Sequence, residues 1–259
     1  SRQAYYQKRQ REVQAAAEEA LILELVQGMR QRHPRMGVRK LQHELQAKLL
    51  ALDISCGRDG LFSILRRHDL LVPVKRSAHR TTWSGTWNYP NLLAELHLER
   101  VHQAWVCDIT YLTTEVGALY LALVTDAFSR FIVGYDLSPS LAGEGTLRAL
   151  QQAIAQAPAS ALPGLIHHSD HGLQYLASPY RAVLADTEIL SSMGEVGNCY
   201  DNALAERING ILKCEYALDS LFVSHAQAHT ATAQAIYLYN FERPHLALNY
   251  RKPAQVHFD

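Results

Sequence analysis

The chain has 259 residues, of which 48% are hydrophobic, so it is long enough for more than one domain and has an ordinary globular composition. No run of about 18 apolar residues occurs, and we therefore expect no membrane-spanning helix. The net charge is zero, but residues 1–100 hold 17 Lys and Arg against 10 Asp and Glu, while residues 101–259 hold 8 against 15. This asymmetry favours nucleic-acid contact by residues 1–100 and metal chemistry in residues 101–259.

The four cysteines are scattered along the chain and form no Cys-x-x-Cys pair. They are Cys56, Cys107, Cys199 and Cys214. This spacing does not favour a structural zinc site. Reduced thiols are the simplest account, so we expect a cytoplasmic protein.

Residues 1–33 are predicted to be mostly helical. The stretch Glu12–Met29 carries apolar residues at helical intervals and has no Pro or Gly before Gly28. Pro34 ends the predicted helix. A helix that only packs against the rest of the chain and a helix that meets a partner both fit this pattern.

Two shorter helices are predicted next, one opening at Gly37 and one running from Arg58 to Leu70. Because a Gly-containing turn joins them, they indicate a helix-turn-helix over residues 34–74. The outward basic residues of the second helix are the candidates for DNA contacts: Arg58, Arg66 and Arg67. The alternative is a packing module, since many small helical hairpins bind nothing.

The segment KRSAHRTTWSGTW has no periodicity and is rich in Ser, Thr and basic residues. It predicts a basic linker, which we place at residues 75–100. Three of its side chains are candidates for contacts with a phosphate backbone: Lys75, Arg76 and Arg80. Solvated linker charge is the alternative.

From Trp105 onward the periodicity changes to that of strands. Three apolar, β-rich runs are predicted, at Trp105–Thr113, Ala118–Asp126 and Arg130–Leu137. The elements predicted after them are a helix at Thr146–Ala157, a strand at Leu165–His168, a helix at Pro179–Leu184, a strand at Glu188–Ser191, and helices at Asp201–Tyr216 and Ser224–Phe241. This order predicts an α/β domain over residues 101–259.

Three carboxylates stand where metal chemistry is favoured. Asp108 lies in the first predicted strand, and Asp170 directly follows a short buried strand, a position where open α/β sheets bind ligands. Glu206 lies on a helix face that also carries Asn202, Asn209 and Lys213. Asn202 and Lys213 are candidates for DNA contacts. Taken singly, each carboxylate is more often a cap or a surface residue.

Several long motifs decide between these interpretations. They are WVCDITYLTT, GALYLALVTDAFSRFIVGYDLS, HSDHGLQY, SSMGEVGNCYDNALAERINGILKCE and YNFERPHLALNYRKPA. Together they resemble the integrase-like transposases of bacterial insertion sequences, the OrfB type of the insertion-sequence-three family. The resemblance covers nearly the whole chain and implies an RNase H-like α/β core behind an N-terminal all-α helix-turn-helix region. It also implies a DDE triad of catalytic and metal-binding residues, which maps to Asp108, Asp170 and Glu206.

The resemblance implies a metal-dependent DNA transposase that cuts the element's ends and transfers strands. Two Mg²⁺ ions, for which Mn²⁺ substitutes, suit an all-carboxylate triad. The implied partners are the terminal inverted repeats, target DNA, a homodimer or higher assembly on paired ends, and an upstream-frame chain or fusion. The implied location is the bacterial cytoplasm, at the nucleoid. The alternatives are an RNase H-like nuclease that does not join DNA, and a non-catalytic DNA-binding repressor.

Overall fold

The computed structural model describes residues 2–73, 89–194 and 202–259. The chain divides into two compact units, Ser1–Arg76 and Ser77–Asp259. The predicted linker at residues 75–100 spans this division. Within the described ranges, no helix is both long enough and apolar enough to cross a membrane.

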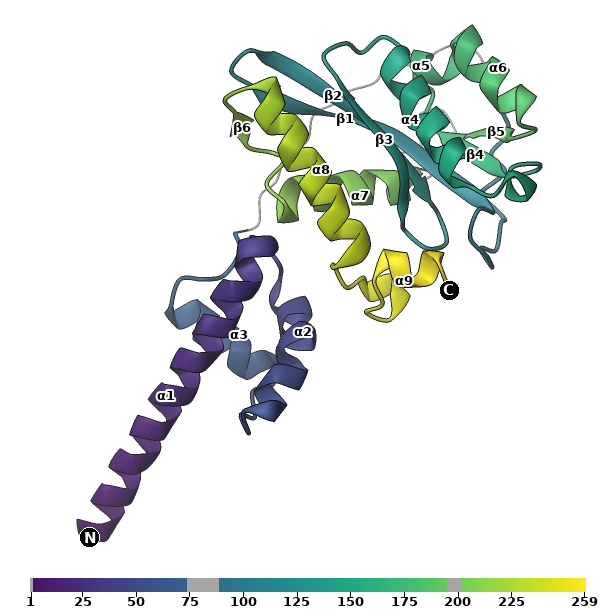
Figure 1. Cartoon of the computed structure of the whole chain (residues 1–259). Helices are drawn as coiled ribbons and strands as arrows, with labels where there is room; N and C mark the ends of the chain where they lie inside the picture. The colour runs from purple at the N-terminus through teal and green to yellow at the C-terminus, as the bar shows by residue number, and fades with distance from the viewer. Residues whose placement is uncertain (1, 74–88, 195–201) are drawn as a thin grey trace. The chain divides into compact units, whose positions relative to one another are not determined.

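The described part of the first unit consists of α1 (Arg2–Arg32), α2 (Val38–Ala51) and α3 (Arg58–Arg67), coloured purple to blue in Figure 1. Its core combines the periodic leucines of α2 and α3 with Ile22 and Val26 of α1. The same core therefore joins the segments that the sequence separates at residue 34. The predicted helices are confirmed, but the third is shorter than predicted because Asp69 adopts a positive φ of 53°.

A mixed sheet forms the centre of the second unit (Figure 1). Its strands are β1 (Ala104–Thr114), β2 (Gly117–Asp126), β3 (Ile132–Ser138), β4 (Ile166–Ser169), β5 (Leu190–Met193) and β6 (Leu221–Phe222). Their order is β3-β2-β1-β4-β5, with β6 paired to β1. The first three strands are antiparallel, whereas β4 and β6 run parallel to β1 and β5 runs parallel to β4. The strand β1 therefore lies at the centre of the sheet.

Helices cover both faces of this sheet. They are α4 (Glu144–Gln156), α5 (Leu173–Leu176), α6 (Ser178–Asp186), α7 (Ala203–Glu215), α8 (His225–Phe241) and α9 (Pro253–His257), with short 3-10 turns η1 (Ala159–Ala161) and η3 (Leu246–Leu248). One core packs α4 and α6 against side chains such as Trp105 and Val124. The other packs α7 and α8 against Leu112 and Leu121. Alternation along each strand therefore serves two cores at once.

The helix α4 approaches β3 very closely. A Cβ atom on Gly134 of β3 would lie 2.2 Å from the backbone oxygen of Ala149. Only glycine therefore allows this packing, which holds α4 on the face of the sheet.

The strand predicted at Glu188–Ser191 begins two residues later, at Leu190. The reason is that Glu188 has a positive φ of 56° and its N–H bonds back to Ala185, which places it in the turn after α6. Three further helices and strands of the described residues were not predicted, and neither were the 3-10 turns. The strand β6 is two residues long, α5 four and α9 five, and elements this short show no usable periodicity.

Candidate active site

Asp108 lies in the middle of β1, the central strand. Its Oδ1 accepts a hydrogen bond from the backbone N–H of Ile109 at 2.9 Å, and its Oδ2 accepts one from Nδ2 of Asn209 at 2.8 Å. Burial, followed by the negative charge of Asp170, raises the pKa of Asp108 to about 7. The carboxyl group is thus held beside other negative charge, an arrangement that a bound cation stabilises.

Asp170 is brought to Asp108 by strand pairing. In the parallel pair of β1 and β4, Val106 lies opposite His168, and each aspartate follows two residues later. The Oδ1 of Asp170 accepts a hydrogen bond from the backbone N–H of Gly172 at 3.0 Å. A Cβ atom on Gly172 would also lie 3.0 Å from that oxygen, so glycine lets the chain turn tightly against the carboxylate.

Glu206 lies in the first turn of α7 and is exposed. Burial, followed by the charge of Asp170, raises its pKa, and Glu206 in turn raises the pKa of Asp108. The three carboxylates therefore share one acidic neighbourhood. In the described parts of the chain, no three His, Cys, Asp or Glu side chains are already grouped closely enough to hold a metal ion. The metal-binding role of the triad stays a prediction.

The polar face of α7 lies against β1. Asn202, just before the helix, is buried and donates from Nδ2 to the carbonyl oxygen of Cys107 at 3.2 Å. Asn209, one turn after Glu206, holds Asp108 as described above. Because both amides are turned inward, the face that the sequence predicted is a contact surface with the central strand.

Lys213 occupies the far end of the same face. Its ammonium nitrogen lies 4.4 Å from the centre of the Tyr111 ring, a cation–π contact. Burial lowers the pKa of Lys213, while the charge of Asp108 opposes that shift. Sequence reasoning placed Asn209 on the helix face of Glu206 without giving it a role, and it did not assign Tyr111 to the site. The helical spacing of three marks Asn209 as a neighbour of Glu206, whereas no spacing on the strand marks Tyr111.

A network of uncharged side chains connects β1, β4 and α6 next to the aspartates. Nε2 of His167 lies 3.0 Å from the Sγ of Cys107 and 2.7 Å from the hydroxyl of Tyr180. Burial lowers the pKa of His167 to about 4, so this network is uncharged near neutral pH. The charge of the site therefore resides on the carboxylates and Lys213.

The loop that carries Asp170 is fastened by a neighbouring histidine. Nε2 of His171 donates to the carbonyl oxygen of Gly194 at 2.6 Å, which joins the ends of β4 and β5. Nδ1 of His168 lies 2.8 Å from the hydroxyl of Ser192 on β5. These contacts support a role for both histidines in orienting Asp170.

Comparison with known proteins identifies the family. Residues 99–199 and residues 187–253 each match a family described as "Integrase core domain". The chain is 35% identical to the insertion element IS600 uncharacterized 31 kDa protein of Shigella sonnei, over 98% of the chain and 93% of that protein. It is 36% identical to the transposase for insertion sequence element IS904 of Lactococcus lactis subsp. lactis, over 68% of the chain and 69% of that protein. The chain belongs to the integrase-like transposases of bacterial insertion sequences.

A third relative agrees with the insertion-sequence-three type that the motifs indicated. The transposase InsF for insertion sequence IS3A of Escherichia coli is 34% identical, over 73% of the chain and 65% of that protein. Among solved structures, a chain of the simian T-cell lymphotropic virus intasome in complex with PP2A regulatory subunit B56 gamma superposes with a TM-score of 0.50 at 18% identity, over 86% of this transposase and 75% of that chain. This likeness concerns the fold alone and confirms the RNase H-like core.

The predicted DNA contacts of this transposase differ in their surroundings. Arg58 pairs with its neighbour Asp59 at 2.8 Å, and Arg67 pairs with Glu19 of α1, whereas Arg66 has neither acidic partner. The predicted linker contacts lie outside the described residues: Lys75, Arg76 and Arg80. None of these contacts is tested by the structure, and all remain predictions.

The residues of the site fit a hard divalent cation. Beside the carboxylates, the side-chain oxygens of Asn202 and Asn209 are buried and have no hydrogen-bond partner among the described residues. Mg²⁺ prefers oxygen ligands and keeps several of its waters, and such waters would satisfy acceptors of this kind. Asp108, Asp170 and Glu206 are the residues that would hold the metal.

Proposed function

We propose that this transposase cuts the ends of its insertion element and joins them to target DNA, with Asp108, Asp170 and Glu206 as catalytic residues. The observation that carries the proposal is geometric. Pairing of β1 with β4 brings Asp170 beside Asp108, and Asn209, one turn after Glu206 on α7, donates to Asp108. Burial, followed by the charges of Asp170 and Glu206, raises the pKa of Asp108 to about 7, and a carboxylate with a perturbed pKa is typical of a functional site.

We infer that the three carboxylates hold two Mg²⁺ ions, for which Mn²⁺ substitutes. Bound ions of this kind activate water and stabilise the attacking and leaving oxygens of an in-line displacement. Asp108 would take part in holding the metal, because strand pairing brings it beside Asp170 and it contacts the helix that carries Glu206. Asn209 holds one oxygen of Asp108, and Lys213 is available to a DNA phosphate.

Two displacements at phosphorus make up the reaction. In cleavage, the oxygen of water bonds to phosphorus at the element's end, and the bond to the 3′ oxygen breaks to leave a free 3′-OH. In joining, the oxygen of that 3′-OH bonds to a target phosphorus, and a 3′ oxygen of the target strand leaves. The chain forms no covalent intermediate in this scheme. Its residues position the DNA and hold the charge.

The assembly that performs these steps brings two element ends together. We propose that it contains the terminal inverted repeats, target DNA and at least a dimer of this transposase, in the bacterial cytoplasm at the nucleoid. An upstream-frame chain or fusion is a further proposed partner. The bacterial insertion elements that supply its relatives support this setting.

The direct test is incubation of the full chain with end-labelled duplexes taken from the DNA that flanks its coding region. We expect nicked and joined products with Mg²⁺ or Mn²⁺, and none with a chelator or with Ca²⁺ alone. Nicking without joining of a pre-cut end would favour the nuclease alternative. Binding without either product in any metal would favour the repressor, and full activity in chelator would contradict the metal proposal.

Replacing Asp108 with Asn should stabilise the metal-free protein. Because the pKa of Asp108 lies above its ordinary value of 3.8, ionising it lowers the free energy of unfolding as pH rises from about 4 to about 7. The Asn side chain does not ionise, so the variant keeps the free energy of unfolding that the wild type loses. This loss is at most about 4 kcal/mol, since one pKa unit corresponds to about 1.4 kcal/mol. Thermal unfolding should therefore show a higher Tm for Asp108→Asn at pH 8 and a small difference at pH 4.

Addition of Mg²⁺ should raise the Tm of the wild-type protein at pH 8 and leave that of Asp108→Asn nearly unchanged. The exposed Asp186 of α6 supplies the matched control, and Asp186→Asn should respond to pH and Mg²⁺ as the wild type does. Equal Mg²⁺ responses of wild type and Asp108→Asn would exclude Asp108 as a ligand.

A further inference from the structure

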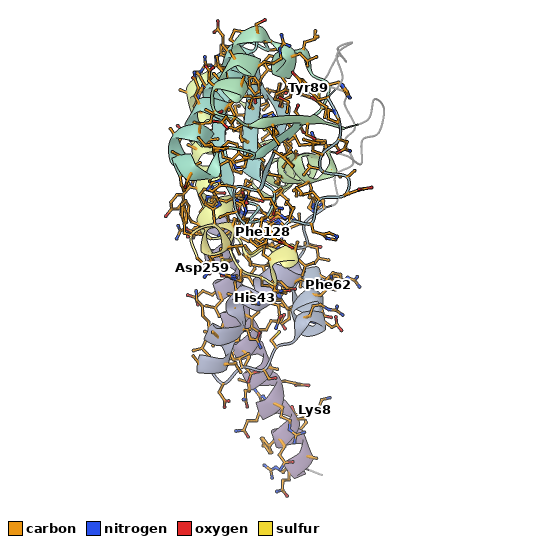
Figure 2. All side chains as sticks on the ribbon, turned by 90° about the vertical axis from the view of Figure 1, so that its right-hand side faces the viewer. Lys8, His43, Phe62, Tyr89, Phe128 and Asp259 are labelled. Carbon is orange, nitrogen blue, oxygen red and sulfur yellow. The ribbon has the colours of Figure 1, made fainter. Side chains whose placement is uncertain are left out.

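The helix α3 has an aromatic side chain on its solvent side. Leu61, Ile64 and Leu65 face the core of the first unit, whereas Phe62 is 37% exposed. Figure 2 labels Phe62 at the surface of the helical unit. A single exposed apolar residue is common and means little by itself.

Phe62 is paired with a cation on the same surface. The guanidinium carbon of Arg66, one turn further along α3, lies 4.8 Å from the centre of the Phe62 ring. A cation–π contact at an exposed site contributes little to stability. The pair therefore contributes little to the stability of the unit. It presents the flat apolar ring of Phe62 beside the N–H donors of the Arg66 guanidinium.

The other arginines of α3 are already engaged by acids. Arg58 pairs with Asp59, and Arg67 shares Glu19 with His68. Arg66 pairs with none of the acidic side chains in the described part of the chain. Of the three arginines predicted to contact DNA, Arg66 is the one whose charge is left for an external anion or base.

We propose that Phe62 and Arg66 form a base-reading pair that recognises a thymine and a neighbouring guanine in the major groove of duplex DNA. Phe62 would contact the thymine methyl group, and Arg66 would donate to O6 and N7 of guanine. The inference rests on the proposed function, in which this unit recognises the element's ends. It assigns Arg58 and Arg67 no part in base discrimination.

Spacing and charge agree with this ligand. Side chains four residues apart on a helix are separated by about 6 Å along its axis, which spans about two base pairs of B-DNA. Residues 1–73 hold 13 Lys and Arg against 8 Asp and Glu, which favours a polyanion. A recognition helix that enters the major groove also presents its exposed face to base edges.

The test begins with selection of preferred sequences from a random duplex library by the full chain, in chelator so that no cleavage occurs. Competition binding at fixed salt then compares the selected duplex with copies carrying deoxyuridine for thymine or 7-deazaguanine for guanine. We expect one thymine at which loss of the methyl group weakens wild-type binding about fourfold, as for one buried methyl group. At an adjacent guanine, loss of N7 should weaken it about tenfold.

The variants assign these effects to residues. Phe62→Ala should bind the thymine and deoxyuridine duplexes equally, whereas Phe62→Leu should keep part of the preference. Arg66→Ala should lose the sensitivity to 7-deazaguanine. Arg11→Ala is the control, an exposed arginine on α1 of the same unit, and should keep both sensitivities.

The outcomes separate this inference from the proposed function. If a sequence is selected but Phe62→Ala keeps its methyl sensitivity, the base-reading pair is wrong while end recognition by this chain stands. If no sequence is selected, end recognition by this unit fails and the pair fails with it. The cleavage assay described above reports on the chemistry independently of either result.

Discussion

Replacement of Glu206 by glutamine is expected to abolish DNA cleavage and strand transfer and to leave DNA binding nearly intact. The substitution keeps the shape of the side chain and removes the charge that would hold a metal ion. Metal ions contribute several kcal/mol to such displacements, so we expect a loss of at least about a thousandfold in the rate of cleavage. Product formation on labelled end DNA in Mg²⁺ measures it.

Two comparisons make this result specific. Binding of the same DNA in chelator should differ little between Glu206→Gln and the wild type, because the Glu206 side chain is exposed and α7 packs through other residues. The exposed Glu144 of α4 supplies the control, and Glu144→Gln should cut normally. Normal cutting by Glu206→Gln would remove Glu206 from the triad.

Removal of Arg243 is expected to cause the largest loss of stability. Arg243 is 2% exposed, and its guanidinium makes two hydrogen bonds to the carboxylate of Glu215, at 2.8 and 2.9 Å. Replacing it with Met leaves the partly buried Glu215 without its partner, and breaking a buried ion pair in this way costs about 3–5 kcal/mol. Urea or thermal unfolding measures the loss.

The double variant Arg243→Met with Glu215→Leu should recover much of this stability, because no unpaired charge remains. The exposed ion pair of Arg251 with Asp259 is the control, and Arg251→Met should cost at most about 1 kcal/mol. If Arg243→Met and Arg251→Met lower the free energy of unfolding equally, burial does not increase the contribution of the Arg243–Glu215 pair to stability.

The same pair sets Arg243 apart from the other basic residues near the C-terminus. Arg243 is buried against Glu215 and lies 5.7 Å from the centre of the Tyr239 ring, whereas Arg251 is exposed. The partner of Arg243 stands 28 residues earlier in the chain, and no local pattern marks such a pair.

Regular local patterns made most of the fold predictable. Apolar residues at periods of two and 3.6 indicate strands and helices because burial repeats with the geometry of each element. The strand β1 and the helix α7 are long enough for that repeat to be seen, whereas β6 is not. The placement of Asp108 beside Asp170 also followed from parallel strand pairing.

The sequence by itself determined the order of the elements, the RNase H-like core and the identity of the three candidate carboxylates, because these depend on local periodicity and on long motifs. Only the tertiary structure decided which polar groups meet. Asn209 reaches Asp108 across 101 residues, and Arg67 reaches Glu19 across 48. Such contacts depend on how helices are rotated and packed against their neighbours, and a one-dimensional pattern of apolar residues does not specify the partner of a polar side chain.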